Sequence, residues 1–179
     1  EALAINREVG NTVWMAVNLN NLGGNSQQIG TNSVARRYFE EALNLRRNVN
    51  DRQGIASSLL SLGIVYLELG DVERAAQALH ESLQQSVAVG RRSYISEGLQ
   101  KCGILALHKE DTVVATQLFA ASTHLASQID FLPTHLSQKR LERATTQARR
   151  ILGDAEFEKA WNAGTALSQD KAVTLALQA

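Results

Sequence analysis

The sequence contains very few cysteine, proline or aromatic residues. Its single cysteine, Cys102, cannot form an internal disulfide bond, which is typical of a reducing, cytoplasmic setting. One proline, Pro133, occurs in 179 residues, and alanine, leucine and glutamine are plentiful. Such a composition favours helix almost throughout. These features predict an all-α protein located in the cytoplasm.

Excess charge and long hydrophobic runs are absent as well. Lys plus Arg and Asp plus Glu number 18 each, so the formal net charge is zero. A balanced chain offers no electrostatic reason to bind nucleic acid or a membrane surface. No apolar run approaches the roughly 20 residues of a membrane span. We therefore predict no direct nucleic-acid binding and no membrane association.

A repeat of forty residues organises the chain. Glycine is costly inside a helix, so a recurring helical glycine indicates a place where a second helix comes close. Each copy predicts two amphipathic helices joined by a turn, of which Gly70-Asp71 is the clearest. Three landmarks recur, a glycine, an alanine and a bulky apolar residue: Gly23, Ala35 and Phe39, then Gly63, Ala75 and Leu79, then Gly103, Ala115 and Phe119.

This period divides the chain into a partial repeat, three full repeats and a helical cap. The expected segments are 1–11 (the second helix of a truncated repeat), the repeats 12–51, 52–91 and 92–131, and the capping helices 132–179. Because the chain opens in what looks like mid-helix, we expect an upstream remainder. A chain cut there exposes an apolar repeat face, which predicts a possible dimer through residues 1–11.

Individual helices are expected at about 12–28, 32–49, 53–69 and 72–89, with two more within 92–129. The polar stretch Gly24–Gln28 predicts a weak, frayed helix end in the first repeat. A further helix is expected from near Pro133, which suits a first helical turn, to about Leu152. Gly153 then ends it, Asp154 caps the next helix through Trp161, and Ser168 caps the last.

These landmarks, including Leu62-Gly63-x-x-Tyr66, Gly70-Asp71 and Ala75, resemble the tetratricopeptide repeat. HEAT and armadillo arrays share the repeat length but not these landmarks. The resemblance implies a right-handed α–α superhelix, a solenoid whose concave surface binds ligands. The lengthened link Leu45–Ala56 and the tail Ala148–Leu177 are similar to the C-terminal regions of bacterial signal-transduction ATPases and LuxR-type transcriptional regulators.

The resemblance implies a non-catalytic scaffold or sensor within such a larger protein. Its partners would be upstream domains of the same chain and a protein, a peptide or a small neutral effector. The alternative is a free-standing adaptor that binds a peptide segment of a partner protein. The two readings differ in whether an ATPase module belongs to the same polypeptide.

The resemblance places the first helix of each repeat on the concave face. The polar candidates there are Asn20, Asn21, Gln27, Gln28, Ser57, Ser61, Glu68, Glu97, Gln100, Lys101 and His108. Amides and hydroxyls dominate this set, which suits a peptide backbone or a neutral polar ligand. The alternative is an ordinary polar surface, on which Glu97 and Lys101 pair with each other one helical turn apart.

The sequence contains no recognisable catalytic or metal-binding constellation. A phosphate-binding Gly-x-x-x-x-Gly-Lys-Ser/Thr loop is absent, as are His-x-x-x-His and Cys-x-x-Cys spacings. Cys102 has no suggested base and is expected to be a buried apolar side chain. Trp14 and Trp161 are interpreted as packing anchors, in the first helix and in the cap. We therefore predict no enzyme activity, no catalytic residues, no cofactor and no metal.

Overall fold

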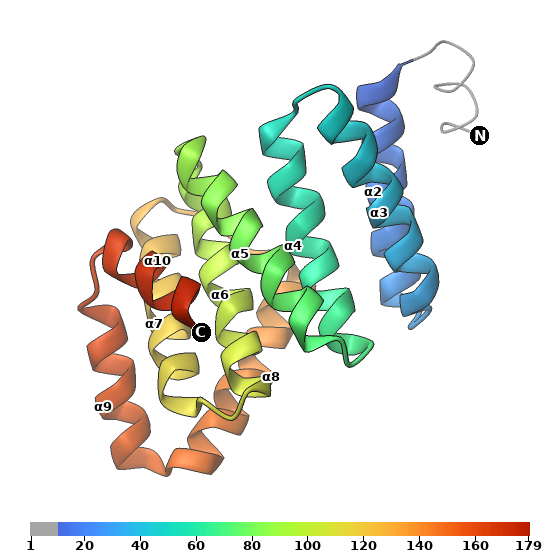
Figure 1. The fold of residues 1–179 in the computed structure, drawn as a ribbon. Coiled ribbons are helices and arrows are strands. Elements are labelled where there is room, and N and C mark those ends of the chain that lie inside the picture. The colour runs from blue at the N-terminus through green and yellow to red at the C-terminus, as the bar shows by residue number, and fades with distance from the viewer. Residues whose placement is uncertain (1–10) are drawn as a thin grey trace. The chain divides into compact units, whose positions relative to one another are not determined.

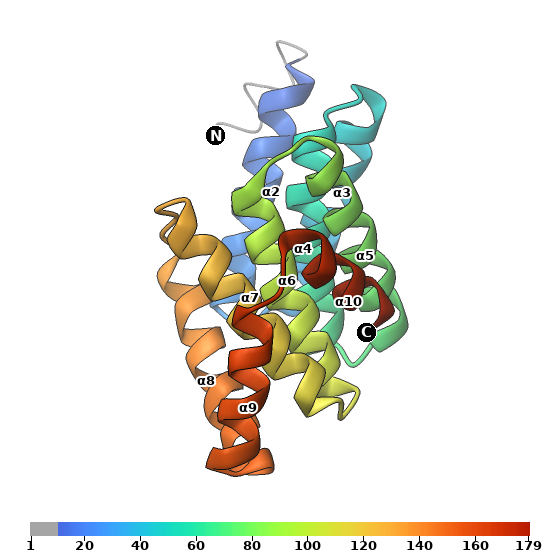
Figure 2. The same cartoon turned by 90° about the vertical axis from the view of Figure 1, so that its left-hand side faces the viewer.

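The computed structural model describes residues 11–179, and all regular structure within that range is α-helical (Figures 1 and 2). The chain forms two compact units, one ending at Val89 and one spanning Gly90–Ala179. The predicted partial repeat lies almost entirely outside the described residues. The first unit contains α2 (Thr12–Gln28), α3 (Asn32–Asn48), α4 (Arg52–Glu68) and α5 (Val72–Ala88). The second contains α6 (Arg92–His108), α7 (Thr112–Gln128), α8 (His135–Leu152), α9 (Asp154–Thr165) and α10 (Gln169–Gln178).

The two helices of each repeat pack closely at a glycine, as the repeat pattern predicts. A Cβ atom on Gly63 would lie 2.5 Å from Cγ of Leu79, which real side chains do not tolerate. Leu79 itself is fully buried. Only a glycine therefore lets α4 and α5 approach to this distance. The same contact occurs between Gly23 and Phe39 and between Gly103 and Phe119.

A buried serine adds a hydrogen bond between the paired helices of the second and third repeats. The Ser82 hydroxyl donates to the backbone carbonyl of Ala56 at 2.8 Å, tying α5 to α4. Forty residues later, the Ser122 hydroxyl donates to the Ser96 carbonyl at 2.8 Å. Each such bond contributes roughly 1 kcal/mol. Periodicity alone did not reveal these bonds.

The turns between helices use backbone conformations with positive φ. Gly70 has φ of +79°, and the Asp71 side chain accepts a hydrogen bond from the Arg74 backbone N–H. The predicted Gly-Asp turn is therefore confirmed. Asn50 and Glu110 adopt the same left-handed conformation without being glycine, with φ of +53° and +65°. An L-residue in this conformation costs about 1 to 2 kcal/mol, although asparagine tolerates it better than most.

Replacing Glu110 by glycine should stabilise the second unit by about 1 kcal/mol. Glycine removes the steric cost of positive φ, and its greater freedom in the unfolded chain offsets only part of this gain. Urea unfolding monitored by Trp161 fluorescence, in a Trp14→Phe background, measures the change. Lys109→Gly is the matched control, because Lys109 has φ of −86° and gains nothing from glycine. A drop in stability for E110G equal to that of K109G would contradict this account.

The C-terminal helices differ from the prediction at two junctions. Helix α8 begins at His135, not at Pro133, because the Thr134 side chain caps it by accepting from the Ser137 N–H. Asp154 is not a cap: Gly153, with φ of +74°, ends α8 and immediately precedes α9. Glycine reaches this conformation without strain, which lets α9 follow α8 directly.

The last two helices end the second unit. Helix α9 continues past Trp161, the predicted end, to Thr165, and it lies along α7 (Figures 1 and 2). Gly164 allows this, because a Cβ there would lie 2.6 Å from the Cα of Gln117 on α7. Ser168 caps α10 by accepting from the Lys171 N–H, as predicted.

Two expectations for the first repeat are wrong. Helix α2 runs unbroken to Gln28, and the Ser26 carbonyl accepts from both the N–H and the hydroxyl of Thr31, so the helix end is not frayed. Trp14 is 57% exposed, so it is not the buried packing anchor that was expected. Because a helix turns by about 100° per residue, Trp14 lies about 200° around α2 from the buried Ala16.

Candidate binding surface

We call the eleven predicted polar residues of the first helices the A-helix face. Asn20, Asn21, Gln27 and Gln28 lie on α2, and Ser57, Ser61 and Glu68 on α4, in the first unit. Glu97, Gln100, Lys101 and His108 lie on α6 in the second unit. Within each unit, the structure separates residues that link successive helices from residues that face outward.

In the first unit, two amides of this face connect α2 to α4. The Gln27 Nε2 donates to Glu68 Oε2 at 3.1 Å. The Asn20 Oδ1 accepts from the Ser58 hydroxyl at 3.4 Å. Successive first helices therefore use these side chains to hold each other. Asn20 and Gln27 therefore each make a contact between α2 and α4.

The same role falls to Gln100 in the second unit. Its Nε2 donates to the backbone carbonyl of Ser137 at 2.9 Å, and its Oε1 accepts from the Ser137 hydroxyl at 2.7 Å. Gln100 is only 3% exposed. Ser137 belongs to α8, which thus contacts α6 in the way that α4 contacts α2. With both amide groups occupied, Gln100 is a packing residue.

Glu97 and Lys101 form an ion pair on α6, as the alternative reading predicts. Their Nζ and Oε2 atoms are 3.7 Å apart, and both side chains are largely buried. Burial lowers the pKa of Lys101 below its ordinary value; Glu97 partly opposes this shift and the nearby Arg140 on α8 adds to it. The pair therefore lies in a poorly solvated position beside α8.

The remaining residues of the A-helix face are at least partly exposed. Asn21 and Gln28 on α2 are exposed, and Ser57 and Ser61 on α4 are half-buried. The Ser61 hydroxyl donates to the Ser57 carbonyl of its own helix at 3.3 Å. We call these four residues the α2/α4 surface. In the second unit His108 is exposed at the end of α6.

A buried arginine that the sequence analysis did not single out lies beneath this region. Arg46 on α3 is 7% exposed, and its Nη1 donates to the Gly54 carbonyl at 2.8 Å and to the Ser58 hydroxyl at 2.7 Å. The same atom reaches Asn20 Oδ1 at 3.4 Å. Arg46 thus joins α2, α3 and α4. In the sequence, Arg46 and Arg47 look alike because they are adjacent arginines in one charged stretch. Nothing in the sequence therefore indicates that Arg46 is buried and Arg47 exposed.

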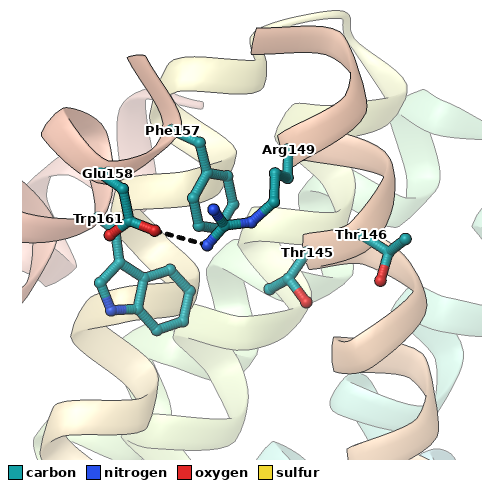
Figure 3. Close-up of a pocket in the computed structure, with 6 residues that line it drawn as sticks. All are labelled: Thr145, Thr146, Arg149, Phe157, Glu158 and Trp161. Atoms are coloured by element: carbon teal, nitrogen blue, oxygen red, sulfur yellow. Dashed lines mark hydrogen bonds and ion pairs between the residues drawn. The ribbon is translucent and has the colours of Figure 1, made fainter. Parts of the chain in front are cut away.

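A shallow pocket of about 400 Å³ lies between α8 and α9 (Figure 3). The Arg149 guanidinium lies 4.1 Å from the ring centre of Phe157, which stacks on Trp161. Asp154 and Glu158 pair with Arg149 at 2.9 and 2.7 Å, and hydrogen bonds to these two carboxylates raise its pKa. Trp161 is half-buried against a core that includes Phe119, as expected for a packing anchor.

Chemically reactive groups are sparse in the part of the chain that the structure describes. Cys102 is fully buried as predicted, and burial raises the pKa of its thiol to about 12. A thiol with so high a pKa is a poor nucleophile. Residues 11–179 bring together no group of three or more His, Cys, Asp or Glu side chains able to hold a metal ion. None of the described helices is long and apolar enough to cross a membrane.

Helix pairs that repeat every forty residues, each closed at a glycine, define an α-helical repeat protein. Residues 14–86 match the family model of the tetratricopeptide repeat, and the same pairing continues in α6 and α7. The chain therefore contains tetratricopeptide repeats. A search of curated proteins finds no match to it. Repeats of this family indicate a scaffold for protein–protein interaction.

Proposed function

We propose that this chain is a non-catalytic scaffold or sensor region of a cytoplasmic bacterial signalling ATPase or transcriptional regulator, which binds a protein partner through the α2/α4 surface. The observation that carries the binding proposal is that Asn21 and Gln28 are exposed and Ser57 and Ser61 partly exposed, whereas Asn20 and Gln27 are engaged in contacts between α2 and α4. Amides and hydroxyls both donate and accept hydrogen bonds, as an extended peptide backbone requires.

The absence of charge among these four residues favours a neutral peptide segment over an acidic or basic one. A neutral polar surface on a rigid pair of helices contributes hydrogen bonds without a large desolvation cost. The link to a larger regulator is supported by the tail Ala148–Leu177, which resembles the ends of such proteins. A free-standing adaptor would use the same surface. The two functions therefore differ in whether the bound peptide belongs to the same polypeptide or to a separate protein.

Substitutions on the α2/α4 surface should weaken peptide binding without unfolding the protein. A library of neutral twelve-residue peptides, screened by fluorescence polarisation against the full chain, supplies the probe. The double variant Asn21→Ala, Gln28→Ala should weaken a selected peptide at least about tenfold, because each lost hydrogen bond contributes roughly 1 kcal/mol. Asn44→Ala on α3 is the matched control, since Asn44 is an equally exposed amide outside this surface.

Equal loss in the control, or unchanged binding in the double variant, would contradict the proposed surface. A selected peptide that occurs in an ATPase module of the same polypeptide supports the regulator. A peptide that occurs only in a separate protein supports the adaptor. Ligand binding to the native state also raises the unfolding temperature, which provides an independent readout.

A further inference from the structure

A second pocket, unrelated to the α2/α4 surface, lies in the C-terminal unit between α6, α7 and the start of α10. Its volume is about 220 Å³, below the roughly 300–1,000 Å³ of sites for drug-sized ligands. Three leucines, Leu99, Leu125 and Leu167, form the apolar part of the pocket. Three polar side chains, Arg92, His124 and Gln128, form its more exposed rim.

The rim holds one guanidinium in a defined position. Arg92 Nη2 donates to Gln128 Oε1 at 2.7 Å. Gln128 Nε2 in turn lies 2.9 Å from His124 Nε2, one helical turn back on α7. This row orients Arg92 through a neutral amide. No aspartate or glutamate lines the pocket, so the positive charge meets no carboxylate there.

The pocket between α8 and α9 also contains an arginine, but that arginine has different partners. There Arg149 is also held beside apolar side chains, but two carboxylates already pair with it: Glu158, as Figure 3 shows, and Asp154. An added anion would have to compete with both. At Arg92 the only side-chain partner in the pocket is an amide oxygen. An incoming carboxylate there forms a charge-assisted hydrogen bond, which is about twice as strong as a neutral one.

We propose that the α6/α7/α10 pocket binds a small monocarboxylic acid with a short aliphatic chain. The carboxylate contacts the Arg92 guanidinium, and the chain lies against Leu125, with the fully buried Leu99 behind it. Leu167, just before α10, closes the apolar part. A pocket of this volume excludes long fatty acids. A cation beside an apolar floor discriminates against neutral or positively charged ligands of equal size.

Hexanoate is the probe, and hexanamide is its neutral counterpart. In NMR titrations of the full chain, hexanoate should shift the backbone amide signals of His124, Gln128 and Gln169, and hexanamide should not. Arg92→Met should weaken hexanoate binding about tenfold or more, whereas Arg92→Lys should retain most of it because the charge remains. The matched control is Arg52→Met, since Arg52 is the exposed first residue of α4 and occupies the equivalent position in the preceding repeat.

Each outcome decides the proposal. Equal binding of hexanamide, or hexanoate binding that survives Arg92→Met, overturns it, as does a loss of equal size in Arg52→Met. Failure of hexanoate to shift any of the three amides at millimolar concentration also overturns it. Acetyl-leucine, tested in parallel, identifies the source of the acid. A preference for it over hexanoate assigns a peptide carboxyl terminus, and the reverse preference assigns a free aliphatic acid. The peptide experiment on α2/α4 is unaffected by either result.

Discussion

Gly164→Ala should destabilise the C-terminal unit by roughly 3 kcal/mol, the upper end of the usual cost of overpacking. The added Cβ would meet the backbone of Gln117 on α7, lying 2.6 Å from its Cα and closer still to its carbonyl oxygen. A flexible side chain could rotate away, but the backbone of a buried helix cannot. Helix α9 would therefore have to move off α7. This shift also disturbs the packing of Trp161 against the core.

Gly24→Ala is the matched control for this prediction. Gly24 is also a helical glycine, but apart from its chain neighbours and the nearby backbone of α2, no atom lies within 4 Å of the position its Cβ would take. There alanine should stabilise the protein by roughly 0.5–1 kcal/mol, its ordinary advantage over glycine in a helix. Urea unfolding followed by Trp161 fluorescence measures the first variant, and circular dichroism measures both. Equal effects of the same sign would show that helix–helix approach does not explain Gly164.

Arg46→Met should destabilise the N-terminal unit by roughly 3 kcal/mol. Methionine preserves much of the apolar packing of the side chain, but it leaves the Gly54 carbonyl and the Ser58 hydroxyl without their charged donor. A buried polar group that loses its partner costs about 1–3 kcal/mol. Asp51, whose Oδ2 lies 4.0 Å from Arg46 Nε, also loses a favourable charge.

The adjacent Arg47 is the control. Its guanidinium pairs with Glu81 at 2.8 Å, but both side chains are well exposed, and such surface pairs contribute about 0–1 kcal/mol. Arg47→Met should therefore change stability by less than 1 kcal/mol. The Ile55 N–H donates to the Asp51 backbone carbonyl at the start of α4. Hydrogen exchange of this amide therefore reports local opening in each variant. Similar protection in both variants would refute a special role for Arg46.

Sequence periodicity predicted those features whose cause is local or repeats with the chain. Helix boundaries followed the forty-residue repeat to within one residue from α2 to α7. The close contact at Gly63 was predictable because an unfavourable helical residue recurs at the same place in every repeat. The cap at Asp71 followed from the preference of aspartate for helix starts. Such signals need no knowledge of distant partners.

The candidate site depended on partners that periodicity cannot name. Asn20 and Gln100 fit the pattern of an outward polar face, but contacts with Ser58 and Ser137 assign both to packing between successive helices. Trp14 was misplaced because a large aromatic residue was assumed to be an anchor, whereas its angular position on α2 directs it outward.

The sequence by itself determined the repeat, its helices, the glycine contacts within each pair and the class of protein. Only the tertiary structure distinguished Arg46 from Arg47, and the close approach at Gly164 from the open position at Gly24. The physical reason is that helix formation depends on neighbours within a few residues. Burial, hydrogen-bond partners and pocket walls depend on which helices come together. Arg92 and Gln128, for example, share a hydrogen bond although they are 36 residues apart in the sequence.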